Sequence, residues 1–187
     1  MNDLGTENNL FNSFVSREEM ELYSAIQELI RNVTDAEIDK IYKQILIVEK
    51  LTENTSDLER QCLLFAKGEL IKRKEKDYST AIEWLMKAIH ITLPDFDGEN
   101  PLRNNLLTFD EIMIINGIAI LHAKSGNVMT AIQLDMWLKE YMEDKIVDGT
   151  MKKAKYPMII YNLSNWFGNK QCHTEALKLA DEGIKFL

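Results

Sequence analysis

A short signature occurs three times in this chain, and its recurrence restricts the fold more than any other feature of the sequence. Each copy is a polar turn, then an alanine and an aliphatic residue that open an amphipathic segment; the copies are Asp77–Ile82, Asn127–Ile132 and Cys172–Leu177. Positions four and seven residues after each alanine share its helical stripe, and small residues there let a neighbouring helix approach closely. A helix-pair unit that recurs buries its apolar faces only against its neighbours. The chain is therefore predicted to be all-α, an α-solenoid of antiparallel helix pairs.

Helix starts are marked by four capping boxes, in each of which a Ser or Thr precedes a Glu by three residues. The boxes are Ser16 with Glu19, Thr34 with Glu37, Ser56 with Glu59, and Thr108 with Glu111. In this motif the hydroxyl accepts a hydrogen bond from a first-turn N–H, and the Glu reaches back to the N–H of the cap. With the apolar periodicity, the boxes predict helices at about 17–32, 35–52, 57–75, 78–92, 109–125, 128–144, 151–169 and 174–186. No strand is expected, because no sustained segment alternates with a period of two.

The spacing of the signatures is that of tetratricopeptide-like repeats with lengthened loops. Ala81, Ala131 and Ala176 are 50 and 45 residues apart, whereas a minimal tetratricopeptide repeat has about 34 residues. A small residue precedes the alanine by twelve positions in the second and third copies and by thirteen in the first; these residues are Ala119, Ser164 and Gly68. We therefore expect a tetratricopeptide-like helical repeat domain over residues 16–187, preceded by an extended lead-in at 1–15.

The composition argues against several classes of protein. The 187-residue chain has a net charge of −8, whereas direct binding to a nucleic-acid backbone needs clustered Lys and Arg. Its two cysteines, Cys62 and Cys172, are too few and too far apart in sequence for a disulfide framework. The polar N-terminal residues lack the apolar region of a signal peptide, and no apolar run is long enough to span a membrane. We expect a soluble, cytoplasmic protein without membrane contact.

Several stretches give the chain a resemblance to a known family. They are Ala81–Ile89, Thr92–Asp97, Leu106–Ile112, Ile118–Ala119 and Tyr161–Ser164. Together they resemble the C-terminal, tetratricopeptide-like half of helix-turn-helix (XRE-type) transcription regulators of Gram-positive bacteria. Among these regulators are the Rgg- and PlcR-like receptors of the peptide pheromones used in quorum sensing. The resemblance covers roughly residues 16–187.

The resemblance implies a ligand-sensing and dimerising domain, which binds a short peptide or protein segment in its concave groove and forms a homodimer. Members of the family begin with a compact DNA-binding helix-turn-helix, and none precedes residue 16 in this sequence. Either an excised sensor domain or a natural regulator-like protein without its DNA reader fits this departure. No direct nucleic-acid contact is expected from this chain, since DNA would be reached only through the missing helix-turn-helix.

The groove of a tetratricopeptide stack is lined by the first helix of each pair. The residues predicted to face it and contact a peptide are Glu69 and Arg73 in the first copy, Asn116 and Lys124 in the second, and Tyr161, Asn165 and Asn169 in the third. Phe65 belongs to the same predicted face. Asn116 and Asn165 are the main candidates for peptide anchors, because an amide both donates and accepts hydrogen bonds with a peptide backbone. The alternative for both is a structural role, in which they bond to carbonyl groups of neighbouring helices.

No enzymatic activity is expected from the sequence. It contains no Gly-rich phosphate loop, no nucleophile elbow and no catalytic dyad at a recognised spacing. Its three histidines lack neighbouring ligands at metal-binding spacing, so neither a metal nor a cofactor is predicted. The alternative function is a constitutive protein–protein interaction scaffold without a small ligand, which an exposed apolar patch on the outer surface would favour.

Overall fold

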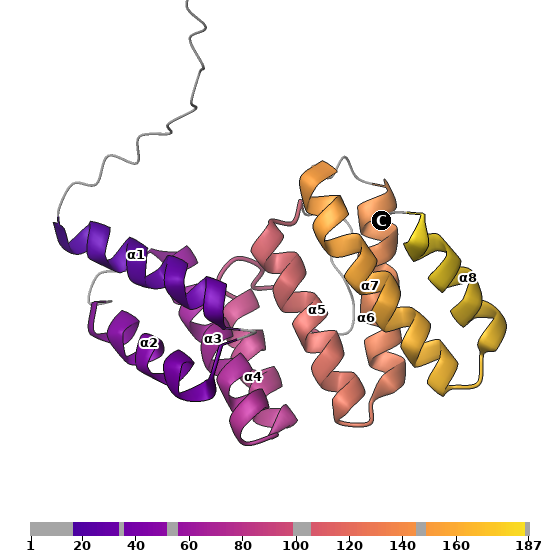
Figure 1. Cartoon of the computed structure of the whole chain (residues 1–187), viewed down its shortest axis with the longest axis horizontal. Coiled ribbons are helices and arrows are strands. Elements are labelled where there is room, and N and C mark those ends of the chain that lie inside the picture. Colours follow the sequence, from indigo (N-terminus) through magenta and orange to yellow (C-terminus); the bar gives the residue numbers. More distant parts are fainter. Residues whose placement is uncertain (1–16, 34–35, 52–55, 99–105, 145–148, 186–187) are drawn as a thin grey trace, which may run out of the picture.

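The chain is all-helical wherever its structure is described. The computed structural model describes residues 17–33, 36–51, 56–98, 106–144 and 149–185, and within these ranges it contains eight α-helices and no strand. The helices are α1 (Arg17–Asn32), α2 (Ile38–Leu51), α3 (Asp57–Lys74), α4 (Tyr78–Ile89), α5 (Phe109–Lys124), α6 (Val128–Asp144), α7 (Gly149–Asn169) and α8 (His173–Ile184). Each packs against the next in sequence, α1 also contacts α3, and α5 also contacts α7. Figure 1 shows α1 and α2 at one end of the molecule and α7 and α8 at the other.

All eight predicted helices are confirmed, with small shifts at their ends. The capping boxes of Ser56 and Thr108 are both complete, with the hydroxyl accepting from the Glu N–H and the Glu carboxylate accepting from the N–H of the cap. The boxes predicted at Ser16 and Thr34 lie outside the described residues. The fourth helix ends at Ile89 instead of 92, because the N–H of Thr92 bonds to the Ile89 carbonyl in a tighter turn.

The same turn connects the two helices of each pair that carries the signature. The residue five positions before the signature alanine has a positive φ in all three copies: 56° at Lys76, 95° at Gly126 and 63° at Gln171. A left-handed residue after a helix C-terminus reverses the chain while its N–H bonds to a carbonyl of the last turn. The three sequence copies therefore share a left-handed residue at this position, although only the second has glycine there.

The small residue before each signature alanine lies where the two helices of a pair approach each other. Ser164 Oγ donates a hydrogen bond to the carbonyl of Ala176 at 2.9 Å. Ala119 and Ala131 are both fully buried. At Gly68 even a methyl group would overlap Leu85 of α4. Of the three positions, Gly68 is the one where close helix contact depends on the absence of a side chain.

The apolar core is divided into two clusters. One is formed by residues of α1, α2 and α3, including Leu29, Ile41 and Ala66. The other is larger, extends from α4 to α8, and includes Leu85 and Ile115. Partly buried Phe65 of α3 packs against both clusters. The junction between the two clusters, at Phe65, is where the candidate site lies.

Candidate functional site

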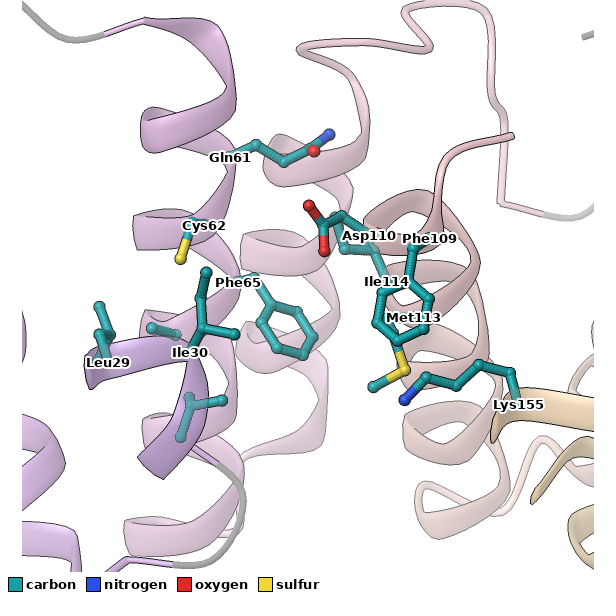
Figure 2. Close-up of a pocket in the computed structure, with 12 residues that line it drawn as sticks. Leu29, Ile30, Gln61, Cys62, Phe65, Phe109, Asp110, Met113, Ile114 and Lys155 are labelled. Carbon is teal, nitrogen blue, oxygen red and sulfur yellow. The ribbon is translucent and has the colours of Figure 1, made fainter. Parts of the chain in front are cut away.

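A hollow of about 200 Å³ opens between α1, α3 and α5, and we call it the α3–α5 hollow. Its walls are mostly apolar, and they come from the first helices of successive pairs. The lining residues are Leu29 and Ile30 of α1, with Val33 just after it; Gln61, Cys62, Phe65 and Ala66 of α3; Phe109, Asp110, Met113 and Ile114 of α5; and Lys155 of α7. Figure 2 shows Phe65 and Met113 projecting into the space between α3 and α5. An apolar concavity with a few polar groups at its edge is the usual form of a ligand site.

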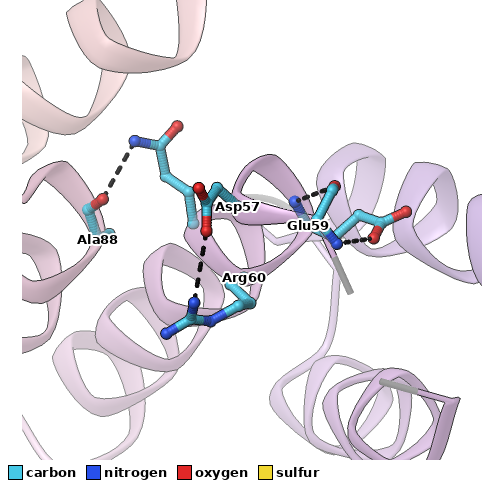
Figure 3. Close-up of polar contacts among 6 residues, drawn as sticks. Asp57, Glu59, Arg60 and Ala88 are labelled. Carbon is cyan, nitrogen blue, oxygen red and sulfur yellow. Dashed lines mark hydrogen bonds and ion pairs between the residues drawn. The ribbon is translucent and has the colours of Figure 1, made fainter. Parts of the chain in front are cut away.

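Local structure fixes the walls of the α3–α5 hollow. The Thr108 capping box starts α5, and therefore places Phe109 and Asp110 in its first turn. On α3, the buried Gln61 side chain donates hydrogen bonds to the Ala88 carbonyl at 3.1 Å and to Thr92 Oγ1 at 2.8 Å. Figure 3 shows the bond to Ala88, next to the first turn of α3. This amide ties the wall of the hollow to the end of α4.

Two opposite charges lie at the rim of the hollow without being paired. Burial raises the pKa of Asp110, the charge of Glu111 raises it further, and Lys155 partly opposes both effects. Burial lowers the pKa of Lys155, and the charge of Asp110 opposes that shift. Within the described residues no ion pair joins Asp110 to Lys155, whose ammonium lies 4.5 Å from the centre of the Phe109 ring. Both charges are thus partly stripped of water and available to groups of a ligand.

The thiol of Cys62, on the α3 wall, is held in its neutral form by its surroundings. Burial, assisted by the charge of Asp110, raises the pKa of its thiol to about 12. The thiolate is the reactive form of cysteine, and at neutral pH it is a negligible fraction of such a group. Cys62 therefore contributes a small, mostly apolar surface to the hollow.

The prediction that Asn116 is exposed to a peptide is wrong. Its side chain is 4% exposed, and its Oδ1 accepts a hydrogen bond from Nδ2 of Asn162 at 2.9 Å. The same amide of Asn162 donates to Oδ2 of the fully buried Asp135 at 3.3 Å. The three side chains join α5, α6 and α7 across their common interface. Asn116 therefore has a structural role, with a side-chain amide as its partner where the sequence had suggested a carbonyl.

Glu69 and Arg73 are also engaged in structure. Glu69 is buried and its carboxylate forms an ion pair with Lys72, one turn away on α3. The guanidinium of Arg73 donates to the carbonyls of Val33 at 3.1 Å and Ala36 at 2.7 Å. Carbonyl groups at and beyond a helix end have no N–H donor within the helix. The Arg73 guanidinium provides the donors for these two carbonyls after the end of α1. Neither side chain lines the hollow, whereas Phe65, on the same predicted face of α3, does.

The remaining predicted residues are exposed but lie elsewhere. Tyr161 lines a second hollow, between α7 and α8 at the C-terminal end of the helix row. Asn165, Asn169 and Lys124 are exposed, and none of them lines either hollow. The structure does not bring these four side chains together with the α3–α5 hollow.

Sequence reasoning missed the residues that α5 and α7 contribute to the hollow. Phe109 and Met113 are four residues apart at the start of α5, a spacing that places them on one helical stripe. The predicted stripe on this helix began later, at Asn116. The Thr108 capping box was the sequence signal that could have identified Phe109 and Asp110, because it places both in the first turn of the helix. No signal in the sequence pointed to Lys155, because its neighbours in the hollow come from another helix pair.

Among the described residues, no cluster of His, Cys, Asp or Glu has the size needed to hold a metal ion. In the same part of the chain, no helix combines the length and the apolar character that crossing a bilayer demands. Comparisons with protein-family models, with curated proteins and with solved structures find no match to this chain.

Proposed function

We propose that the chain is an α-solenoid of tetratricopeptide-like helix pairs, and that its concave face binds a short peptide through one large apolar side chain. Three features support the solenoid. The left-handed turn residue recurs at the same distance from each signature alanine. A small residue occupies the close contact within each signature pair, and successive helices pack in chain order. Repetition of one contact geometry along a chain is the basis of solenoid folds.

The observation that carries the peptide proposal is the origin of the walls of the α3–α5 hollow. They come from α1, α3 and α5, with Lys155 of α7 at the rim, and these are the first helices of all four pairs. In a tetratricopeptide stack the first helices line the groove. The volume of about 200 Å³ is below the roughly 300–1,000 Å³ of pockets that enclose a whole small molecule. It suits one side chain of a longer ligand, with the rest of the ligand lying outside.

The rim charges fit the polar groups of a peptide. Lys155 offers an ammonium to a peptide carbonyl or carboxylate, and Asp110 offers a carboxylate to an N–H or an amino terminus. Both groups are partly desolvated in the free protein. Hydrogen bonds to a ligand would replace the water that these groups have lost, so they favour a ligand with polar groups beside its apolar anchor.

We also propose, on the resemblance described above, that peptide occupancy is a signal within a transcription regulator. A ligand in the hollow touches α1 and α3 on one side and α5 on the other, at the junction of the two core clusters. If it binds one relative orientation of the clusters more tightly than another, it shifts the population toward that orientation. The shift would be transmitted to any DNA-binding element attached to the chain.

The test uses a matched pair of exposed isoleucines. Ile30 lines the hollow and is 46% exposed, whereas Ile47 of α2 is 51% exposed and does not line it. A phage-displayed heptapeptide library is selected on the immobilised chain, and the affinities of the selected peptides are measured by fluorescence anisotropy. Ile30→Glu should raise the Kd at least about tenfold, or about 1.4 kcal/mol, and Ile47→Glu should leave it unchanged. Failure to enrich any peptide, or equal binding by both variants, would overturn the proposal.

A further inference from the structure

The end of the α3–α5 hollow at the start of α5 carries more negative than positive charge. Asp110 and Lys155 are the charged residues of the lining. Glu111 follows Asp110 in the first turn of α5, is buried, and its charge raises the pKa of Asp110. Two carboxylates thus act on this end of the hollow, and one ammonium opposes them. Electrostatics therefore favours a cationic group of a ligand here over an anionic one.

Only one of the two carboxylates is open to a ligand. Glu111 accepts a hydrogen bond from the N–H of Thr108 at 2.6 Å, which completes the capping box. Asp110 accepts no hydrogen bond and joins no ion pair within the part of the chain that the structure describes. Figure 2 shows its carboxylate directed toward the space between α3 and α5. Its charge also acts on the opposite wall, where it contributes to the raised pKa of the Cys62 thiol.

The amino terminus of a peptide fits this open carboxylate better than its other donors do. An α-ammonium has three N–H donors and a full charge, whereas an internal peptide unit has one neutral N–H. Hydrogen bonds between charged groups are about twice as strong as neutral ones. In the first residue of a peptide, the ammonium and the side chain are attached to the same Cα, so the side chain can enter the hollow while the ammonium stays at the rim. A lysine side chain of the ligand would have to order a long, flexible stem to reach the same place.

We propose that the α3–α5 hollow recognises the amino-terminal residue of a peptide, whose side chain fills the hollow while its ammonium donates to Asp110. This inference rests on the proposed peptide function and adds which residue of the peptide is bound. Lys155 extends from α7 toward the hollow, and its ammonium lies 4.5 Å from the centre of the Phe109 ring. It is the donor for a backbone carbonyl that follows the first residue. The ligand is thus a peptide with a free amino end, and a blocked end or an internal segment of a protein binds poorly.

The first arm of the test compares derivatives of one peptide. The tightest heptapeptide selected on the chain is synthesised with a free amino end, with an acetylated amino end, and with an amidated carboxyl end. Each unlabelled form competes with the fluorescent parent peptide in an anisotropy titration. Acetylation should raise the Kd at least about tenfold, because it removes the charge and two of the three donors. Amidation of the carboxyl end should leave the Kd unchanged.

The second arm changes the carboxylate, with Asp110→Asn as the variant and Asp57→Asn as its matched control. Asp57 also lies in the first turn of a helix that begins with a complete capping box, and it does not line the hollow. Asp110→Asn should raise the Kd of the free-amine peptide at least about tenfold and should not weaken the acetylated peptide further. This non-additivity would identify the ammonium as the partner of Asp110. Asp57→Asn should leave both Kd values unchanged, and both variants should keep the helical circular dichroism of the wild type.

Three results would overturn this inference alone, provided that Ile30→Glu still weakens binding. They are equal affinities of the free and acetylated peptides, a loss of affinity on amidation in place of acetylation, and an Asp110→Asn variant that binds as tightly as the wild type. The second result would place the carboxyl end of the peptide at Lys155. A chain that enriches no peptide, or whose peptide tolerates Ile30→Glu, would contradict the proposed function and this inference together.

Discussion

Replacing Gly68 by alanine tests whether the spacing of the helix pairs depends on the absence of a side chain. A Cβ at this position would lie 2.2 Å from Cδ1 of Leu85 and 3.2 Å from the carbonyl oxygen of Ala81. Leu85 has little room to move away, because its Cδ2 is already 2.9 Å from where a Cβ on Gly117 of α5 would lie. The leucine is fully buried between two glycines on α3 and α5.

The expected cost follows from two opposing effects. Overpacking a close-packed core costs about 1–3 kcal/mol. Alanine gains about 1 kcal/mol over glycine inside a helix. Because Leu85 is confined on both sides and the Ala81 contact is to backbone, we place the overpacking cost in the upper part of its range. The Gly68→Ala variant should lose about 1–2 kcal/mol of unfolding free energy, and its Tm should fall by about 2–8 °C.

The assay is thermal and urea unfolding followed by circular dichroism, with Gly168→Ala as the control. Gly168 lies in α7, and its added Cβ would meet only the Cβ of Ala176, at an ordinary 3.9 Å. This control should therefore gain up to about 1 kcal/mol from helix propensity alone. If Gly68→Ala were as stable as the wild type while Gly168→Ala was stabilised, the close approach of α3 and α4 would not need glycine and the reasoning would be refuted.

Three further substitutions have predictable effects on stability. Burial holds the pKa of Asp135 well above its usual range, and its Oδ1 has no hydrogen-bond partner among the described residues. The folded chain thus keeps a proton that the unfolded chain releases above about pH 4, and stability should fall as pH rises, by up to about 1.4 kcal/mol per pH unit. Asp135→Asn should remove this pH dependence and be more stable than the wild type at pH 8. The check is to measure the Tm of both proteins between pH 4.5 and 8. Parallel plots of Tm against pH for the two proteins would contradict the prediction. Gln171→Gly should stabilise the folded chain by about 1 kcal/mol, because a non-glycine residue at φ 63° is strained. Gly126→Ala should destabilise the fold, because it places a side chain at φ 95°. Shifts of Tm with the same sign in both variants would contradict this explanation.

The helices could be predicted from sequence because their signals are local. Ser56 and Glu59 form their capping box within a single turn, and the same is true of Thr108 and Glu111. These interactions depend on the sequence spacing alone. The left-handed conformation of the three turn residues is harder to predict from the sequence. Only Gly126 among them is a glycine, the residue type that a positive φ favours.

The site was harder to predict because it depends on the rotation of each helix about its own axis. Asn116 was assigned to the groove from its spacing within α5, yet the packing of α7 against α5 turns it inward to Asn162. Arg73 could not be excluded from the groove without knowing that the end of α1 leaves carbonyls within its reach. Side-chain burial and hydrogen bonds between helix pairs depend on tertiary packing. A single sequence therefore does not predict them directly.

The position of the α3–α5 hollow follows from where the helices are closest. Leu85 of α4 lies against both Gly68 of α3 and Gly117 of α5, so α4 approaches both helices closely at this point. The Phe65 ring also lies close to this point, 3.8 Å from where a Gly117 Cβ would be, and both Phe65 and Met113 line the hollow. The contact of α4 with Gly117 and the wall of the hollow at Phe65 therefore lie next to each other. A substitution at Gly68 that displaces Leu85 should therefore disturb the packing at Gly117 and Phe65, and so should change peptide affinity as well as stability.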